Sequence, residues 1–294
     1  MKLENRAPAE GINASHENPL KELAWLLAGS LAAVVAIVFA VSLAAQWIAP
    51  RIPYKYEARL AASLPSFATA PDTEPGRQVQ VELQALADRL AARMQMPEGM
   101  IVRVGWRDDR IVNAYATLGG QMVFFGGLLK QLGSEDALAM VMAHELAHLK
   151  YRHASAALGR GVAVGVILSV ISAELGRNAA GGLLNQAGIV TLLSFSRDQE
   201  RAADEAALSA VAAEYGHLAG AFELFEVFQR QAGAKFEAAG AVEFLRTHPL
   251  TASRRAAIEH WAAANKVPTT GSPRPLPPAI ATLREGARRN AKAS

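Results

Sequence analysis

The longest uninterrupted apolar stretch of the chain lies near its N-terminus. From Leu23 to Pro50 there is no charged residue, and Trp25 and Trp47 stand near the two ends. Such a run is long enough to cross a bilayer as one helix, and tryptophans favour the membrane–water interfaces. A buried core helix of this length normally shows a polar stripe. We therefore interpret residues 23–50 as a membrane anchor that follows a flexible tail, residues 1–22.

The residues that flank this run bear on its processing and orientation. An acidic leader and a long apolar run favour an anchor that stays attached over a cleaved signal peptide. Lys21 precedes the span, whereas Arg51, Lys55 and Arg59 follow it. The positive-inside rule thus leans towards a cytoplasmic location for the residues that follow the span, but the difference is too small to assign it. We expect a single-pass protein of a bacterial inner membrane, in contact with the lipid bilayer and with its sidedness open.

Beyond the span, the pattern divides the chain into a linker, a folded domain and a tail. Five prolines between residues 50 and 77 indicate a linker over 51–77. A folded domain is expected over 78–266, and the Pro-rich, basic stretch 267–294 predicts a mostly disordered tail with a short helix near Ile280. The domain opens with a helical apolar stripe: Val79, Leu83, Leu86, Leu90 and Met94.

Alternating residues then predict a small sheet. The runs 101–106, 111–117 and 121–125 alternate like strands, and Gly119–Gly120 between the last two predicts a hairpin. An edge strand here offers an extended peptide a place to dock by strand addition. A purely structural hairpin is the alternative.

The chemistry centres on the next helix, which Ser134 can cap. It carries His144-Glu145-x-x-His148. Residues four apart lie on one face of a helix, so the two histidines can hold one metal ion between them. Glu145 is adjacent and can reach a water on that metal. Two imidazoles and a carboxylate are what zinc-assisted hydrolysis requires.

A helix that begins at Ser196 and runs to about Tyr215 provides a candidate third ligand. Glu200 completes a set of two histidines and one glutamate, which leaves the fourth position to water. Asp204, one turn later, can accept a hydrogen bond from the far nitrogen of a metal-bound histidine. The alternative for both carboxylates is a solvated helix face among other charges.

Three further residues are candidates for the site. His153 lies on a different helix face from the histidine pair, and we interpret it as structural or as an outer support of a ligand. His248, in Thr-His-Pro, precedes Arg254. These two can stabilise a developing oxyanion, and a surface histidine in a turn is the alternative for His248.

Apolar residues return between the two metal-binding helices, in the pieces 161–173 and 181–195. Each piece is short for a membrane span. They predict either two buried helices under the active site or a hairpin that dips into the membrane. A protease that is held inactive because the region 161–195 covers its cleft is a further alternative.

The composition restricts which residue types can bind a metal and which partners the chain can have. The 294 residues carry a formal charge of +3 and no cysteine. Any zinc, which we expect as one ion, must therefore be held by histidine and carboxylate. The small net charge is not typical of a nucleic-acid-binding protein, which would show a clustered basic face. We predict zinc-dependent hydrolysis of internal peptide bonds, with polypeptide substrates. A membrane-anchored, chaperone-like binding module with a structural metal is the alternative.

Several ordered motifs resemble the HtpX-like zinc metallopeptidases, the gluzincin group that includes the CAAX prenyl endopeptidases. The resemblance covers about residues 78 to 262. Its motifs are 113–120, 127–129, 144–148, His153, 196–204, 247–249 and Arg254.

This resemblance implies an α+β, mostly helical, zincin-type (gluzincin) catalytic domain with a small β-sheet, attached to the N-terminal transmembrane helix. It implies zinc on His144, His148 and Glu200, with Glu145 as base, and a role in protein quality control. It also implies that the strand with Asn113, Ala114 and Tyr115 lines the substrate cleft.

Overall fold

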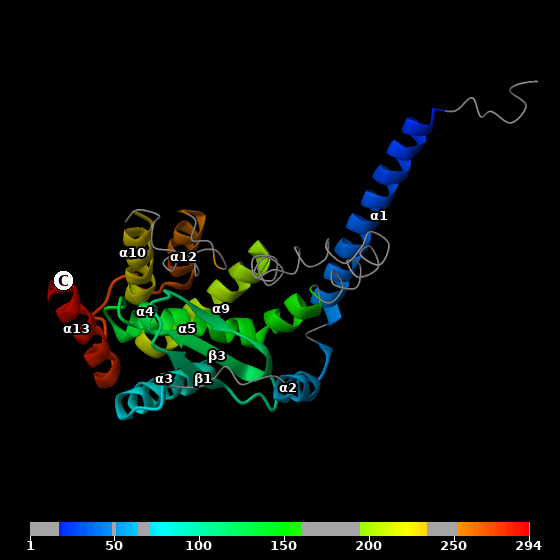
Figure 1. Ribbon diagram of the computed structural model, residues 1–294. Helices are drawn as coiled ribbons and strands as arrows, with labels where there is room; N and C mark the ends of the chain where they lie inside the picture. Colours follow the sequence, from blue (N-terminus) through cyan, green and yellow to red (C-terminus); the bar gives the residue numbers. More distant parts are fainter. Residues whose placement is uncertain are drawn as a thin grey trace, which may run out of the picture.

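The fold begins with a long helix that extends away from the rest of the molecule (Figure 1). In the computed structural model, α1 (Pro19–Ile48) is the one described helix that is long and apolar enough to cross a membrane, and none of its span Pro19–Val41 is buried. Trp25 and Trp47 are both exposed. The structure describes residues 18–48, 51–63, 71–159, 161, 195–233, 248 and 252–293.

The stretch 51–77 is not simply a linker, which corrects the prediction from its prolines. It contains α2 (Tyr54–Ala62) and the first turn of α3 (Glu74–Arg93). Thr73 caps α3, because its hydroxyl accepts a hydrogen bond from the backbone of Gly76. The predicted apolar stripe of α3 is confirmed, since all five of its residues are buried.

A three-stranded sheet follows α3. It consists of β1 (Arg103–Arg107), β2 (Ala114–Ala116) and β3 (Gln121–Phe125), in the order β1-β3-β2. β1 is parallel to β3, and β2 is antiparallel to it with Tyr115 opposite Val123. The predicted hairpin is thus confirmed, although β2 is shorter than the run 111–117. A 3-10 turn, η2 (Leu118–Gly120), connects its strands, and both glycines have positive φ.

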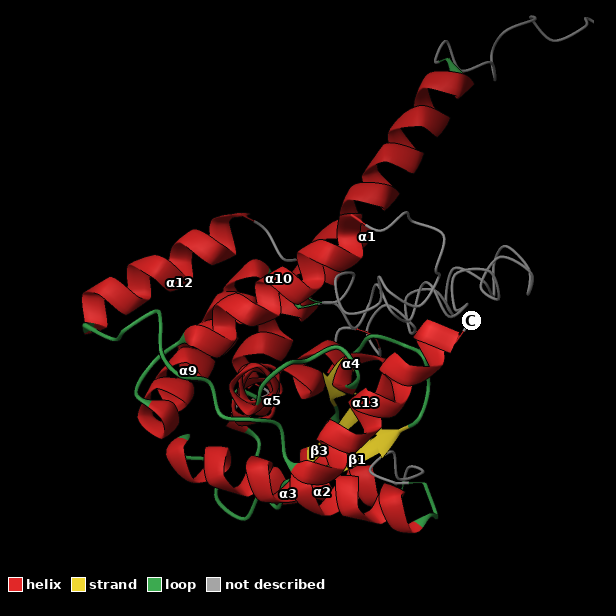
Figure 2. Cartoon of the chain, turned by 90° about the vertical axis from the view of Figure 1, so that its left-hand side faces the viewer, coloured by secondary structure: helices red, strands yellow, loops and turns green. Residues whose placement is uncertain are grey.

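Helix α5 (Glu135–Lys150) forms the centre of the domain, and Figure 2 views it almost end on. It follows the short helix α4 (Gly126–Leu129) and is buried continuously from Asp136 to Leu149. The predicted cap is present, because the Ser134 hydroxyl accepts a hydrogen bond from the backbone of Ala137. Helices α3, α9 and α10 and strand β2 all pack against α5.

The remaining helices complete the domain. Helix α9 (Arg197–Tyr215) starts with a capping box between Ser196 and Gln199 and ends at Gly216 in a left-handed conformation. It is followed by α10 (Ala219–Gly233) and α12 (Ala252–Asn265). The domain is mostly helical with a small sheet, as expected for an α+β zincin. The predicted helices or cover between 161 and 195 fall almost entirely outside the described residues.

The C-terminal stretch confirms one prediction and corrects another. The helix expected near Ile280 is present as α13 (Pro278–Ala293), but it is longer than expected and packs against α3 and α4, so this stretch is not a mostly disordered tail. The Glu82 carboxylate of α3 accepts hydrogen bonds from the backbone of Ala279, at 2.9 Å, and of Ile280, at 3.1 Å. An anionic cap at a helix N-terminus satisfies free amides and the helix dipole together. Leu276 and Ile280 are buried beneath it.

Candidate metal centre

Two histidines of α5 and one glutamate of α9 converge in the interior. His144 and His148 lie one turn apart, and their Nε2 atoms are 3.1 Å apart. The carboxylate of Glu200 lies 3.5 Å from Nε2 of His144 and 3.6 Å from Nε2 of His148. Helix α9 packs along α5, so Glu200 lies beside the two histidines although it is distant from them in the sequence. The structure therefore brings the three predicted metal ligands together.

The spacing of these atoms suits one metal ion. Two ligands at about 2.0–2.1 Å from a tetrahedral ion lie roughly 3.3 Å from each other. One atom each from His144, His148, Glu200 and His248 falls within 4.8 Å of the others. Oε2 of Glu200 is buried and accepts no hydrogen bond from the described residues, as expected for an oxygen arranged for a cation. Imidazole and carboxylate, without thiolate, are donors that zinc accepts.

His248 lies inside this cluster, not in a solvated turn beside it. Its Nδ1 is 3.2 Å from Nε2 of His144 and 2.9 Å from Oε1 of Glu200. Its Nε2 is 3.5 Å from Oε1 of Glu145. In this position the imidazole can serve as a fourth metal ligand. It can also serve as the hydrogen-bond donor that the sequence predicted.

The outer side of His144 faces a carboxylate and an arginine. Nδ1 of His144 lies 3.0 Å from Oδ1 of Asp204, as the spacing of Asp204 from Glu200 predicted. Arg254 of α12 donates to both oxygens of Asp204, at 2.7 and 2.5 Å, and lies 3.4 Å from Glu200. Arg254 thus holds the carboxylates that support the cluster. Its predicted contact with an oxyanion stays a prediction.

The outer side of His148 faces His153 and an aromatic ring. The Nδ1 atoms of His148 and His153 are 2.8 Å apart, so one of them carries the proton of a hydrogen bond. His153 comes back to His148 because Arg152, just past the helix end, adopts φ of 57°. The ring of Phe195 stacks on His148, with 4.0 Å between the ring centroids. No local sequence pattern indicates the Phe195 contact.

Glu145 is fixed through one oxygen and directed at the cluster through the other. Its Oε2 accepts a hydrogen bond of 2.8 Å from the backbone of Ala116 in β2. Its Oε1 faces His248 and accepts no hydrogen bond from the described residues. The predicted base therefore has one oxygen that can receive a proton. Sequence reasoning missed the Ala116 amide, because no side-chain pattern marks a backbone donor.

Burial and neighbouring charges set the protonation of these groups. Burial disfavours the cationic form of His144, but Asp204 and Glu200 outweigh it and raise the pKa to about 9. Burial and the other histidines lower the pKa of His148 well below its usual range. Burial opposes ionisation of Glu200, but His144 and His248 lower its pKa. Burial raises the pKa of Glu145. Neutral His148 and ionised Glu200 are the forms that bind metal.

The predicted substrate strand lies at the edge of the sheet, next to α5. Asn113 and Ala114 are buried, and Tyr115 is partly buried against Phe125. The Asn113 carbonyl accepts a hydrogen bond from the backbone of Phe125. Its side-chain oxygen is buried without a hydrogen bond from the described residues. The direct link from this strand to the cluster is the Ala116 amide on Glu145, whereas peptide binding by residues 113–115 stays a prediction.

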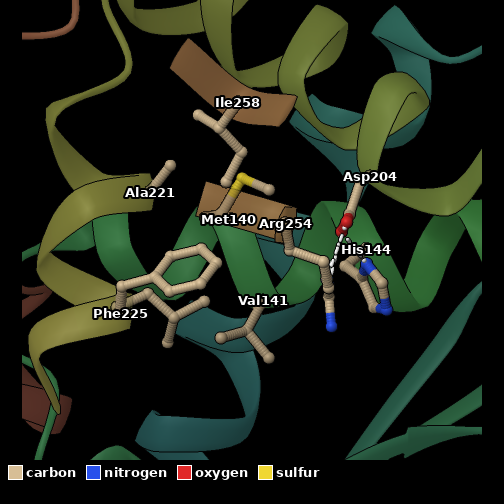
Figure 3. Close-up of a pocket in the computed structure, with 9 residues that line it drawn as sticks. Met140, Val141, His144, Asp204, Ala221, Phe225, Arg254 and Ile258 are labelled. Atoms are coloured by element: carbon tan, nitrogen blue, oxygen red, sulfur yellow. Dashed lines mark hydrogen bonds and ion pairs between the residues drawn. The ribbon is translucent and has the colours of Figure 1, made fainter. Parts of the chain in front are cut away.

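An apolar pocket lies behind His144, between α5, α10 and α12 (Figure 3). Figure 3 draws the contact between Arg254 and Asp204 at its edge, next to the His144 ring. An apolar wall lowers the local dielectric, which strengthens this charged contact. The apolar side chains that line the pocket include Met140, Val141, Ala221, Phe225 and Ile258.

The chain matches known proteins over this same domain. The model of Peptidase family M48 matches residues 77–262. Mitochondrial metalloendopeptidase OMA1 of Schizosaccharomyces pombe is 34% identical over 155 residues, which cover 52% of this chain and 44% of that protein. The beta-barrel assembly-enhancing protease of Yersinia pestis is 30% identical over 155 residues, which cover 49% of this chain and 31% of that protein.

A third relative is the beta-barrel assembly-enhancing protease of Escherichia coli K12, which is 32% identical over 104 residues, or 32% of this chain and 21% of that protein. The chain thus matches less than half the length of each of these relatives. The metallopeptidase resemblance that the motifs suggested is confirmed at the level of the family. The chain belongs to peptidase family M48.

Proposed function

We propose that this protein is a membrane-anchored, zinc-dependent endopeptidase that hydrolyses internal peptide bonds of polypeptides. The observation that carries the proposal is the buried cluster of His144, His148 and Glu200, with Glu145 directed at it. Family membership supports the enzyme class. A structural metal site has no use for a buried carboxylate with an available oxygen, so Glu145 favours a catalytic site over a structural one.

His144, His148 and Glu200 would hold the zinc ion. When bound, zinc polarises a carbonyl and lowers the pKa of water towards neutrality. Glu145 would accept the proton of the attacking water through Oε1 and deliver it to the leaving nitrogen. The Ala116 amide holds Oε2 throughout, so the carboxylate keeps its direction while it gains and loses that proton.

Other residues of this chain would orient the reactants. His248 would donate a hydrogen bond to the oxygen of the tetrahedral intermediate, because its Nε2 lies within the cluster, 3.5 Å from Oε1 of Glu145. Arg254 supports Asp204 and Glu200, and through them His144. Asp204 and His153 would keep the outer nitrogens of His144 and His148 in place.

The substrate would be an extended, unfolded or membrane-associated polypeptide that pairs with β2. β2 is at the edge of the described sheet and lies against α5. Strand addition satisfies backbone groups of an unfolded segment with little dependence on its sequence. Residues Asn113, Ala114 and Tyr115 would form the strand that receives it. Such a specificity fits a role in protein quality control.

Helix α1 would anchor the enzyme, as a single pass, in a bacterial inner membrane. Its length, its exposed apolar side chains and the tryptophans near its ends support this location. The names of the relatives, a mitochondrial metalloendopeptidase and beta-barrel assembly-enhancing proteases, fit the proposed proteolysis.

The test compares Glu145→Gln with the parent, as the full chain in detergent micelles with casein as substrate. Glu145→Gln should retain the metal and lower kcat by about 10²- to 10⁴-fold, because the base is lost. Glu205→Gln, on the exposed side of α9, is the matched control and should keep parent activity. Chelation should abolish parent cleavage.

Cleavage by Glu145→Gln at the parent rate would refute the mechanism. Bound metal in the parent without cleavage of any unfolded protein would favour the alternative function, a membrane-anchored, chaperone-like or binding module with a structural metal. The full chain is required because α2 and α13 pack on the domain.

A further inference from the structure

A buried glutamate of α2 lies outside the segment that the family model matches. The match begins at residue 77, whereas Glu57 is at the middle of α2 and is only 7% exposed. Its Oε1 accepts a hydrogen bond of 2.9 Å from the backbone of Gly119. Its Oε2 accepts from Nε of Arg152 at 2.7 Å and from the Ser155 hydroxyl at 2.5 Å. Each oxygen thus holds a different part of the domain.

The contacts of Oε2 lead to the metal cluster through the end of α5. Arg152 also donates to the backbone carbonyl of Ile52, so α2 and the residues before it hold its guanidinium from two sides. Arg152 adopts φ of 57°, an unfavourable conformation for a residue with a side chain. This turn returns His153 to a position 2.8 Å from Nδ1 of His148. Oε2 of Glu57 therefore supports the turn that orients a predicted metal ligand.

The contact of Oε1 leads to the predicted base, Glu145. Gly119 lies in η2, which connects β2 to β3, and a side chain there would collide with the methyl group of Ala61 in α2. Helix α2 therefore approaches the connection as closely as backbone allows. The β2 strand at the other side of this connection provides the Ala116 amide that holds Glu145. Oε1 of Glu57 therefore supports the hairpin that orients the base.

We propose that α2 is part of the active-site scaffold, with Glu57 as a positioning residue that fixes His148 through Arg152 and Glu145 through the β2–β3 connection. The inference rests on the proposed peptidase function. It also ties the anchor to the site, since α1 ends at Ile48 and α2 begins at Tyr54. Between them, the backbone of Ile52 donates to Ile48, and Arg51 stacks over Trp47.

Three variants of the full chain in detergent test this proposal. Glu57→Ala removes both acceptors. Glu57→Gln keeps the side-chain volume but has only one carbonyl oxygen. It can therefore accept either the hydrogen bond made by Oε1 or those made by Oε2, but not both. Lys55→Ala, on the exposed side of the same helix, is the matched control. The readouts are metal retention against a competing chelator, kcat and KM for casein, and circular dichroism with thermal unfolding.

Glu57→Ala should weaken metal retention and lower kcat, each by about 10- to 100-fold, with little change in KM. Glu57→Gln should lie between Glu57→Ala and the parent, and Lys55→Ala should match the parent. Metal retention is measured without cleavage, so it tests the positioning role even if the proposed peptidase function fails.

A folded Glu57→Gln protein with parent metal retention and parent kcat would overturn the proposal. A lower melting temperature with both other readouts unchanged would do the same, because it would assign Glu57 to stability alone. If Glu57→Ala does not fold, Glu57→Gln decides by the same criteria.

Discussion

Helices α1 and α5 are both rich in apolar residues, but they place them in opposite surroundings. None of the span Pro19–Val41 of α1 is buried, whereas α5 is buried continuously from Asp136 to Leu149. After Glu22, α1 carries no ionisable side chain. Helix α5 buries four ionisable side chains among its apolar ones: Asp136, His144, Glu145 and His148.

This difference shows what a buried helix requires of its neighbours. A helix satisfies its own backbone, so an apolar helix in lipid requires no further polar partner. Each buried polar side chain does require one, or it destabilises the fold. Ala116 holds Glu145, Asp204 faces His144, His153 holds His148, and the backbone of Arg274 donates to Asp136. The polar groups of α5 thus specify which distant segments surround it.

A buried charge in each helix is the strongest test of this comparison. Leu146→Asp should abolish folding of the domain, because an unpaired buried carboxylate costs several kcal/mol against a total stability of about 5–15 kcal/mol. Leu31→Asp in α1 should leave domain melting unchanged and weaken membrane insertion by about 3–4 kcal/mol. Thermal unfolding in detergent and flotation with liposomes measure the two effects. Equal losses of domain stability would show that α1 is part of the core.

Removal of His248 tests what a segment distant in sequence contributes to the cluster on α5. His248→Ala should lower kcat by about 10²- to 10³-fold, or about 2.7–4 kcal/mol, because a donor to the oxyanion is lost. Metal content should remain, since His144, His148 and Glu200 are intact. His260→Ala, an exposed histidine of α12, is the control. Increased cleavage by His248→Ala would contradict the donor role and identify His248 as a ligand that blocks the site.

Removal of His153 should produce the smallest effect of the three. His153→Ala removes the partner of Nδ1 of His148, which should weaken metal binding by about 10- to 100-fold, or about 1.4–2.7 kcal/mol. Competition with a chelator measures the change, and His260→Ala again serves as control. Unchanged metal affinity would mean that the contact between the two rings does not orient the ligand.

Local signals in the sequence were sufficient for much of α5 and α9. The Ser134 cap, the spacing of His144 and His148 and the carboxylates of the helix after Ser196 all act within a few residues, and each is present in the structure. The alternation around Gly119 likewise predicted the β2–β3 hairpin. Such signals depend on backbone geometry that the sequence fixes over one or two turns.

Helix α2 had no comparable local signal, and for α13 the sequence predicted only a short helix near Ile280 within a tail. Helix α2 is short, and its buried Glu57 has its arginine partner 95 residues later. Helix α13 is capped by Glu82, 198 residues before Ile280. The prolines near both helices predicted a linker and a tail, because isolated short helices gain little from their own hydrogen bonds. Contacts with the rest of the fold stabilise them instead.

The sequence by itself determined the motifs of this protein: an apolar N-terminal run long enough to span a membrane, a histidine pair with an adjacent glutamate, and a carboxylate pair one turn apart on a later helix. These features arise from spacing along one helix. The tertiary structure alone decided that His248 enters the cluster, that Arg254 holds Asp204, and that Glu57 supports both His148 and Glu145. The physical reason is that buried polar groups are satisfied by whichever segments packing brings near, and local sequence does not record that choice.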